Sequence, residues 1–111
     1  MLVTRSSPFG GRTRTLVLLA LSLLGDSFAR ELARLLEVPV NGVQQALRGL
    51  EKDGIVAGRL AGRTRLYQLN PRYFARKELA DYLRRLAEPE GDLQVRVENL
   101  RRRPRRAGKP L

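Results

Sequence analysis

The apolar run Leu16–Leu24 is followed by three segments in which apolar residues recur at helical spacing. Such spacing places apolar side chains on one face of a helix, so each segment predicts a helix that packs into a core. In chain order the predicted helices span Leu16–Leu24, Phe28–Leu36, Val40–Asp53 and Tyr73–Ala87. Residues typical of helix boundaries separate them, since Asp26 or Ser27 can cap the second helix, Pro39 suits the first turn of the third, and Gly54 suits its end.

A hairpin is predicted between the third and fourth helices. Ile55–Arg59 and Thr64–Leu69 read as two short strands around the glycine-containing turn Leu60–Arg63. Alternation in the second strand does not decide which of its faces is buried. A helix–turn–helix followed by this two-stranded wing is the simplest architecture that gives the first three helices a shared core. We therefore predict a mainly α fold with a small β-hairpin, a winged helix–turn–helix.

A chain of 111 residues has room for one domain. Residues 1–11 mix serine, proline, glycine and arginine without an apolar period, which predicts a flexible basic arm. The folded domain is expected over residues 12–87, and a linker with an arginine-rich tail over 88–111. Within that tail, residues 93–100 fit either a helical stripe or strand alternation.

The apolar run Leu16–Leu24 has nine residues, well short of the roughly 20 that a membrane-spanning helix needs. The arginines before it leave a secretory signal as the alternative reading. We favour a core helix, because the apolar stripe of the next helix needs a neighbour to pack against. The expected location is therefore the cytoplasm, in association with the nucleoid, with no membrane partner.

The charge balance indicates a polyanionic partner, since 22 Lys and Arg face 11 Asp and Glu for a net charge of +11. The chain has no Cys and no His, which excludes disulfides, histidine base catalysis and the usual zinc ligand sets. Carboxylates that could act as a pair, such as Glu51 with Asp53, have no neighbouring nucleophile or phosphate loop. We expect no enzyme activity, no catalytic residues, no cofactor and no metal.

The segment from Phe28 to Val56 resembles winged helix–turn–helix regulators of the ArsR/MarR type. Its most specific portion is the pattern L-x-x-L-E-x-x-G-[IL]-[VI] over Leu47–Val56, and the similarity covers about residues 12–87. The resemblance implies a transcriptional regulator that binds double-stranded DNA and forms homodimers through terminal helices. Pro39 and Gly42 depart from the usual pattern, and the missing Cys and His exclude metal sensing in its usual form.

Three groups of residues are the candidate DNA contacts. The third helix would read bases in the major groove, because Asn and Gln pair with adenine and Arg with guanine; its candidates are Pro39, Asn41, Gln44, Gln45 and Arg48. The wing would reach the flanking backbone or the minor groove through Arg59, Arg63, Thr64 and Arg65. Phosphate contacts from the arms would come from Arg12, Arg14, Arg101, Arg102 and Arg103. Each group has an ordinary alternative as a solvated surface or a solubilising tail.

The fourth helix has more apolar positions than one side of a small core requires. A dimer interface is therefore predicted at Leu79, Tyr82, Leu83 and Leu86. The alternative is that this stripe folds back over the first helix. Two other functions remain open: a protein assembly module whose arginine tail binds nucleic acid or an acidic partner, and an architectural DNA binder of low specificity.

Gly49, inside the third helix, predicts the close approach of another helix.

Overall fold

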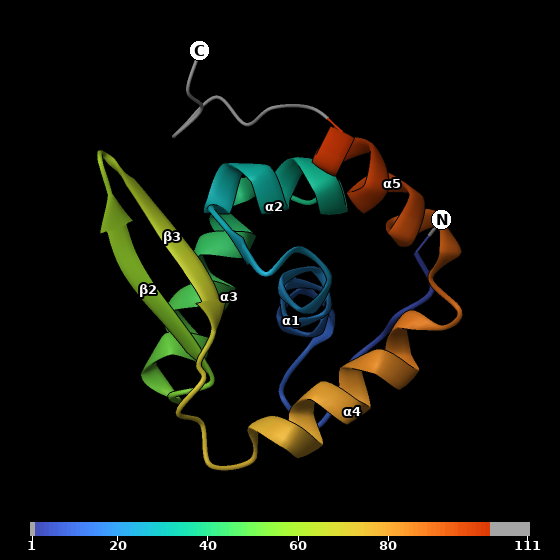
Figure 1. Ribbon diagram of the computed structural model, residues 1–111, viewed down its shortest axis with the longest axis horizontal. Coiled ribbons are helices and arrows are strands. Elements are labelled where there is room, and N and C mark those ends of the chain that lie inside the picture. Colours follow the sequence, from blue (N-terminus) through green and yellow to red (C-terminus); the bar gives the residue numbers. More distant parts are fainter. Residues whose placement is uncertain (1, 103–111) are drawn as a thin grey trace.

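The computed structural model describes residues 2–102, which form five helices and a three-stranded sheet (Figure 1). The helix, short strand, helix, helix and hairpin follow one another in a winged-helix-like arrangement, to which two further helices are added. The bounds are α1 Arg12–Leu24, β1 Asp26–Ser27, α2 Ala29–Leu36, α3 Val40–Lys52, β2 Val56–Ala61, β3 Thr64–Leu69, α4 Arg76–Ala87 and α5 Gly91–Arg102.

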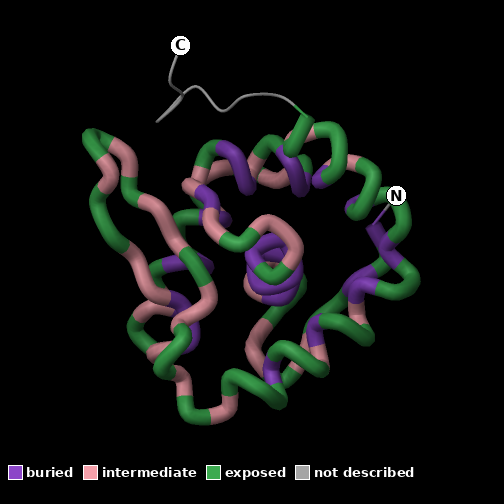
Figure 2. The backbone as a smooth tube through the Cα atoms, viewed as in Figure 1, coloured by how far each residue is buried: buried purple, intermediate pink, exposed green. Residues whose placement is uncertain are grey.

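Helix α1 lies in the middle of the molecule, and the other helices and the sheet surround it (Figures 1 and 2). Residues Leu16 to Ala20 are all 0% exposed, so the helix is covered on every side. A helix in such a position needs apolar residues all round, which explains the unbroken run in its sequence. The core-helix interpretation of Leu16–Leu24 is confirmed. Within residues 2–102, none of the helices has the length and apolar character needed to cross a membrane.

Helices α2 and α3 are joined by a tight turn. Glu37 adopts a left-handed conformation at φ 59°, and Pro39 is extended directly before α3. The predicted cap of α2 is wrong, because Phe28 occupies that position and Ser27 belongs to β1. The Ser27 hydroxyl instead donates a hydrogen bond of 2.6 Å to the buried Glu31 carboxylate. This contact ties the short strand to the first turn of α2.

The hairpin pairs β2 with β3 in antiparallel register, and only Gly62 and Arg63 remain in the turn. Gly62 has φ 66°, a left-handed conformation that suits glycine in a two-residue turn. Strand β2 therefore extends two residues beyond the predicted Arg59. The two-residue strand β1, which was not predicted, pairs with β3 and gives the order β1-β3-β2. Tyr67 and Leu69 pack against the core, which identifies the buried face of β3.

The N-terminal residues form an ordered strap across the ends of α4 and α5. Leu2 and Thr4 are buried, and the buried Glu90 carboxylate accepts hydrogen bonds from the Val3 and Thr4 backbone N–H groups and from the Thr4 hydroxyl. The Arg12 side chain donates to the Thr4 carbonyl oxygen at 3.1 Å. The expectation of a flexible arm therefore does not describe residues 2–11.

Residues 91–102 form α5, which packs against α1 and α2. Leu93 and Val97 are buried while Val95 is 58% exposed, so the helical alternative is the one the chain adopts. Arg96 donates a 2.8 Å hydrogen bond to the Leu35 carbonyl at the end of α2. The expected linker and tail thus belong to the folded domain as far as Arg102, and the remainder of the tail lies outside the described residues.

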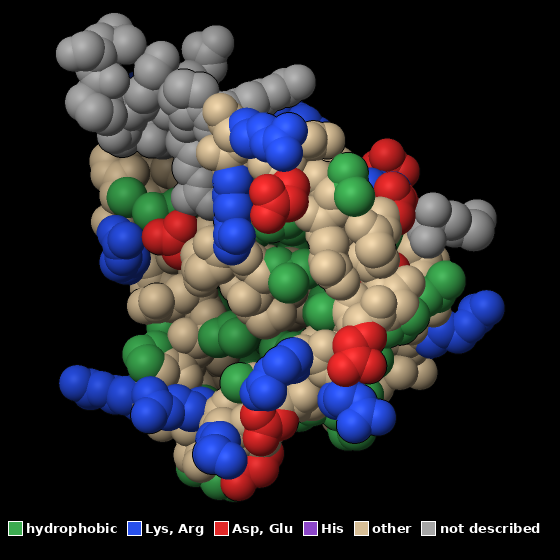
Figure 3. Space-filling view, turned by 45° about the vertical axis from the view of Figure 1, so that its right-hand side comes forward, with side chains coloured by type: hydrophobic (Ala, Val, Ile, Leu, Met, Phe, Trp, Pro, Cys, Tyr) green, Lys and Arg blue, Asp and Glu red, His purple; other side chains and the backbone are tan. Residues whose placement is uncertain are grey.

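Helix α4 begins at Arg76, three residues later than predicted, and folds back onto α1. Leu79 and Leu83 are buried in the core, and Tyr82 and Leu86 are half-buried against it. Leu79 and Leu83 are covered by the core of their own chain, which favours the alternative of an intramolecular stripe over the predicted dimer interface. The face of the molecule in Figure 3 carries basic, acidic and hydrophobic side chains next to one another.

Candidate nucleic-acid interface

The outer face of α3 presents a stripe of polar side chains. Asn41, Gln44, Gln45 and Arg48 are all exposed, because Val43, Ala46, Leu47 and Leu50 turn the opposite face into the core. None of the four exposed side chains forms a hydrogen bond or ion pair with another residue in 2–102. Their donors and acceptors are therefore available to a ligand. Lys52 is also exposed and continues this stripe one turn beyond Arg48, a periodic signal that the sequence-based prediction missed.

Pro39 immediately precedes α3 and is exposed. No acidic residue occurs in the first turn of this helix. The positive end of the helix dipole therefore faces no carboxylate from its own first turn. Pro39 fixes the direction in which the chain enters α3, and its side chain has no group that could form a hydrogen bond.

Arg65 joins the hairpin to α3. Its guanidinium lies 2.7 Å from the Glu51 carboxylate and packs 5.7 Å from the centre of the Tyr67 ring. The hydrogen bond with Glu51 raises the pKa of Arg65 above its ordinary value. Gly58 makes room for this arrangement, because a Cβ there would lie 2.9 Å from the Arg65 Nε. Arg65 is thus a strut between the hairpin and the helix of the candidate interface.

The other candidate residues of the hairpin are in three different environments. Arg59 lies on the opposite face of the hairpin from Arg65 and comes within 3.8 Å of the Asp26 carboxylate. Thr64 is half-buried. Arg63 is exposed in the turn and forms no ion pair within the described portion of the chain. The predicted wing residues therefore do not form one cluster, and Arg63 is the cation at the tip of the hairpin.

Arg14 has a structural position at the C-terminal end of α3. Its guanidinium contacts the Asp53 carboxylate at 2.7 Å, and its Nε donates to the Phe9 carbonyl. A Cβ on Gly49 would lie 2.5 Å from the Arg14 Nη1, so this glycine makes room for a side chain of α1, the neighbouring helix that packs on α3, in agreement with the predicted approach of another helix. Arg12 is likewise bonded to the strap. Neither residue extends from a flexible arm.

The two carboxylates near the end of α3 are each neutralised by an arginine, Glu51 by Arg65 and Asp53 by Arg14. This pairing weakens the repulsion that either carboxylate would exert on a polyanion. Arg48 and Lys52 form no ion pair with another described residue, so they contribute unneutralised positive charge to the same helix. The local charge of the interface is therefore positive, in agreement with that of the whole chain.

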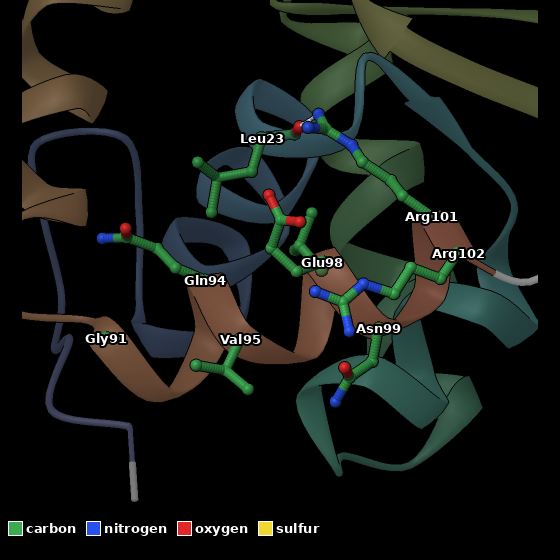
Figure 4. Close-up of a pocket in the computed structure, with 9 residues that line it drawn as sticks. Leu23, Gly91, Gln94, Val95, Glu98, Asn99, Arg101 and Arg102 are labelled. Carbon is green, nitrogen blue, oxygen red and sulfur yellow. Dashed lines mark hydrogen bonds between the residues drawn. The ribbon is translucent and has the colours of Figure 1, made fainter.

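Arg101 and Arg102 lie at the end of α5 and are exposed. The Arg101 guanidinium reaches the Leu23 carbonyl oxygen at the end of α1 (Figure 4). Both arginines line an open hollow together with Gln94, Val95 and Glu98, and no residue of α3 or the hairpin borders it. The structure thus does not join these cations to the α3 stripe, and Arg103 lies outside the described residues.

Within residues 2–102, no group of three or more acidic side chains is arranged to hold a metal ion. Every buried side-chain nitrogen and oxygen in that range has a hydrogen-bond partner. Comparisons with protein families, with curated proteins and with solved structures find no match. The exposed stripe of α3 and Arg63 on the neighbouring hairpin therefore form a candidate interface on the basis of their geometry alone.

Proposed function

We propose that this protein binds double-stranded DNA through α3 and the β2–β3 hairpin and thereby regulates transcription. The observation that carries the proposal is the stripe of exposed, unpaired side chains on α3, with Arg63 on the neighbouring hairpin. The major groove of B-DNA, about 12 Å wide, admits a single helix. Helix α3 supplies the polar face for that groove, and the hairpin extends beside it toward the flanking backbone or minor groove.

The side chains on α3 have the chemistry of base recognition. Asn41, Gln44 and Gln45 each carry an amide that can donate to and accept from adenine, while Arg48 can donate twice to guanine. A good pair of this kind discriminates between bases by about 1–3 kcal/mol. Arg63, Lys52 and the net charge of +11 add attraction to phosphates that is independent of sequence. Together these groups support sequence-specific binding.

The proposed class is the ArsR/MarR type, which the pattern over Leu47–Val56 resembles. The winged-helix-like order of elements supports this assignment. The homodimer expected from the resemblance and the expected cytoplasmic location remain within the proposal. The dimer contact would have to use surfaces other than Leu79 and Leu83, because both side chains lie inside the core.

The test is selection from a pool of random duplexes at physiological salt. The full chain is compared with a chain that ends at Arg102, since this truncation keeps α5 and removes only the last nine residues. Enrichment of one motif by both proteins supports a sequence-reading regulator, and a palindromic motif supports a dimer. Enrichment of nothing, with affinity lost on truncation, would assign nucleic-acid binding to the arginine tail and leave the winged helix as an assembly module.

A further inference from the structure

The hairpin exposes one large apolar side chain. Leu60, on β2, is 70% exposed, whereas Val56 on the same strand is 2% exposed. Single exposed leucines are common on protein surfaces and by themselves indicate nothing. The position of Leu60 relative to α3 and to the arginines of the hairpin is what gives it a chemical role.

The strand register fixes the direction of Leu60. Leu60 is paired directly with Arg65, and opposed residues of an antiparallel pair place their side chains on the same face. Arg65 reaches Glu51 of α3 on that face. Leu60 therefore projects from the face of the hairpin that is turned toward α3. The pair Leu60–Arg65 follows the pair Gly58–Tyr67 on this face and lies nearer the tip of the hairpin.

Positive charge lies close to this leucine in the chain. Arg59 precedes it on the opposite face of the hairpin, and Arg63 follows in the two-residue turn. Proteins that enter the minor groove combine arginines, which bind in the groove, with apolar wedges that insert between stacked base pairs. Leu60 and Arg63 supply these two elements at the end of the hairpin.

We propose that Leu60 is an apolar wedge that enters the minor groove beside the α3 site and bends the DNA. This inference rests on the proposed function, because α3 in the major groove brings the hairpin across the phosphate backbone to the adjacent minor groove. A wedge of this type kinks the duplex toward the major groove by about 20–90°. Pyrimidine–purine steps unstack most easily, so Leu60 adds a preference for such a step outside the bases that α3 reads.

The experiment uses the full chain and a duplex selected by it. Fluorescence energy transfer between the duplex ends measures the bend, and 2-aminopurine placed at each flanking step in turn measures unstacking. We expect the wild-type chain to bend the duplex and to raise 2-aminopurine fluorescence at one flanking step. Leu60→Ala should lose most of both signals, and Leu60→Phe should retain them. Val95→Ala, which truncates an exposed apolar side chain on α5, is the matched control and should behave as wild type.

Thermal unfolding of each variant verifies that the fold is intact, which is expected because Leu60 is exposed. If the wild-type chain binds the selected duplex without bending it, or if Leu60→Ala bends it equally, the wedge is overturned while the proposed function stands. If the wild-type chain enriches no duplex at all, the proposed function fails, and the wedge fails with it.

Discussion

Arg65 of β3 and Glu51 of α3 lie 2.7 Å apart and link the hairpin to the helix beside it. The two side chains are 43% and 33% exposed, so water screens their attraction. An ion pair of this exposure contributes at most about 1 kcal/mol to stability. Its larger effect is on the orientation of the hairpin, because the contact holds β3 beside α3.

Arg65→Ala is predicted to lower DNA affinity by loosening the hairpin. The free energy of unfolding should change by less than about 1 kcal/mol, because the pair is partly solvated. Hydrogen exchange of the β2 and β3 amides should become faster than in the wild type. Unchanged exchange of the hairpin amides would contradict the role of Arg65 as a strut.

Glu51→Ala distinguishes a strut from a direct phosphate contact. If Arg65 positions the hairpin, removing either partner of the pair lowers affinity. If Arg65 instead binds phosphate, Glu51→Ala releases it from a competing carboxylate and raises affinity. We expect both variants to bind more weakly than the wild type, as measured by titration of a selected duplex at constant salt.

Gln45→Ala and Arg63→Ala are predicted to affect binding in different ways. Gln45 lies on the exposed face of α3, so its loss should relax base preference at one position, by about 1–3 kcal/mol. Arg63 lies in the turn, and its loss should weaken all sequences alike and reduce the salt slope by about one unit. Selection profiles at two salt concentrations measure both effects. An unchanged profile for Gln45→Ala would remove that residue from base recognition.

The elements of the fold that were predictable are those with local periodicity. Helices α2 to α4 each have an apolar pattern that repeats within a few residues, α1 is an apolar run, and the hairpin is marked by its glycine-containing turn. The strap was not predictable, because Thr4 is buried through a contact with Glu90, 86 positions along the chain. Strand β1 has only two residues, too few to show alternation. For α5 the pattern fitted two structures, and packing of Leu93 and Val97 on the core decides between them.

The candidate site was predictable on α3 and only partly predictable on the hairpin. The polar stripe of α3 is exposed because the same periodicity that buries Leu47 directs Gln44, Gln45 and Arg48 outward. The hairpin arginines looked equivalent in the sequence, since their clustering does not reveal their faces. Strand register and the position of Glu51 separate Arg65 from Arg59. Such pairings depend on tertiary structure.

Leu83→Ala is predicted to destabilise the folded protomer. Leu83 is 0% exposed and packs from α4 into the core around α1, and a buried leucine replaced by alanine typically costs about 2–5 kcal/mol. Denaturant unfolding measures this loss, and sedimentation velocity measures the oligomeric state of the folded protein. Val95→Ala, at a 58% exposed position, is the control and should change stability by less than about 0.5 kcal/mol. A change in oligomeric state without loss of stability would return α4 to a dimer interface.

Glu90→Gln is predicted to release the N-terminal strap. The Glu90 carboxylate is buried and accepts hydrogen bonds from three donors of Val3 and Thr4, which a neutral amide with one oxygen cannot replace. We expect a loss of about 1–3 kcal/mol in stability and faster hydrogen exchange at the Val3 and Thr4 amides. Glu88→Gln is the matched control, because Glu88 is largely exposed and its nearest basic contact is 3.9 Å away at Arg85. Equal protection of the strap in both variants would contradict the anchoring role of Glu90.

Truncation before and after α5 should have separate consequences. A chain ending at Asp92 loses the burial of Leu93 and Val97 and the hydrogen bond from Arg96 to Leu35. Burial of each apolar side chain is worth about 1.5–3 kcal/mol, so the loss is a large share of the roughly 5–15 kcal/mol that stabilises a domain.

A chain ending at Arg102 keeps these contacts and removes four basic residues, Arg103, Arg105, Arg106 and Lys109. We therefore expect the chain that ends at Arg102 to unfold at the same denaturant concentration as the wild type and to enrich the same DNA motif. Its salt slope should fall by about 0.9 for each removed cation that contacts phosphate. A chain ending at Asp92 that unfolds like the wild type would show that α5 does not stabilise the core.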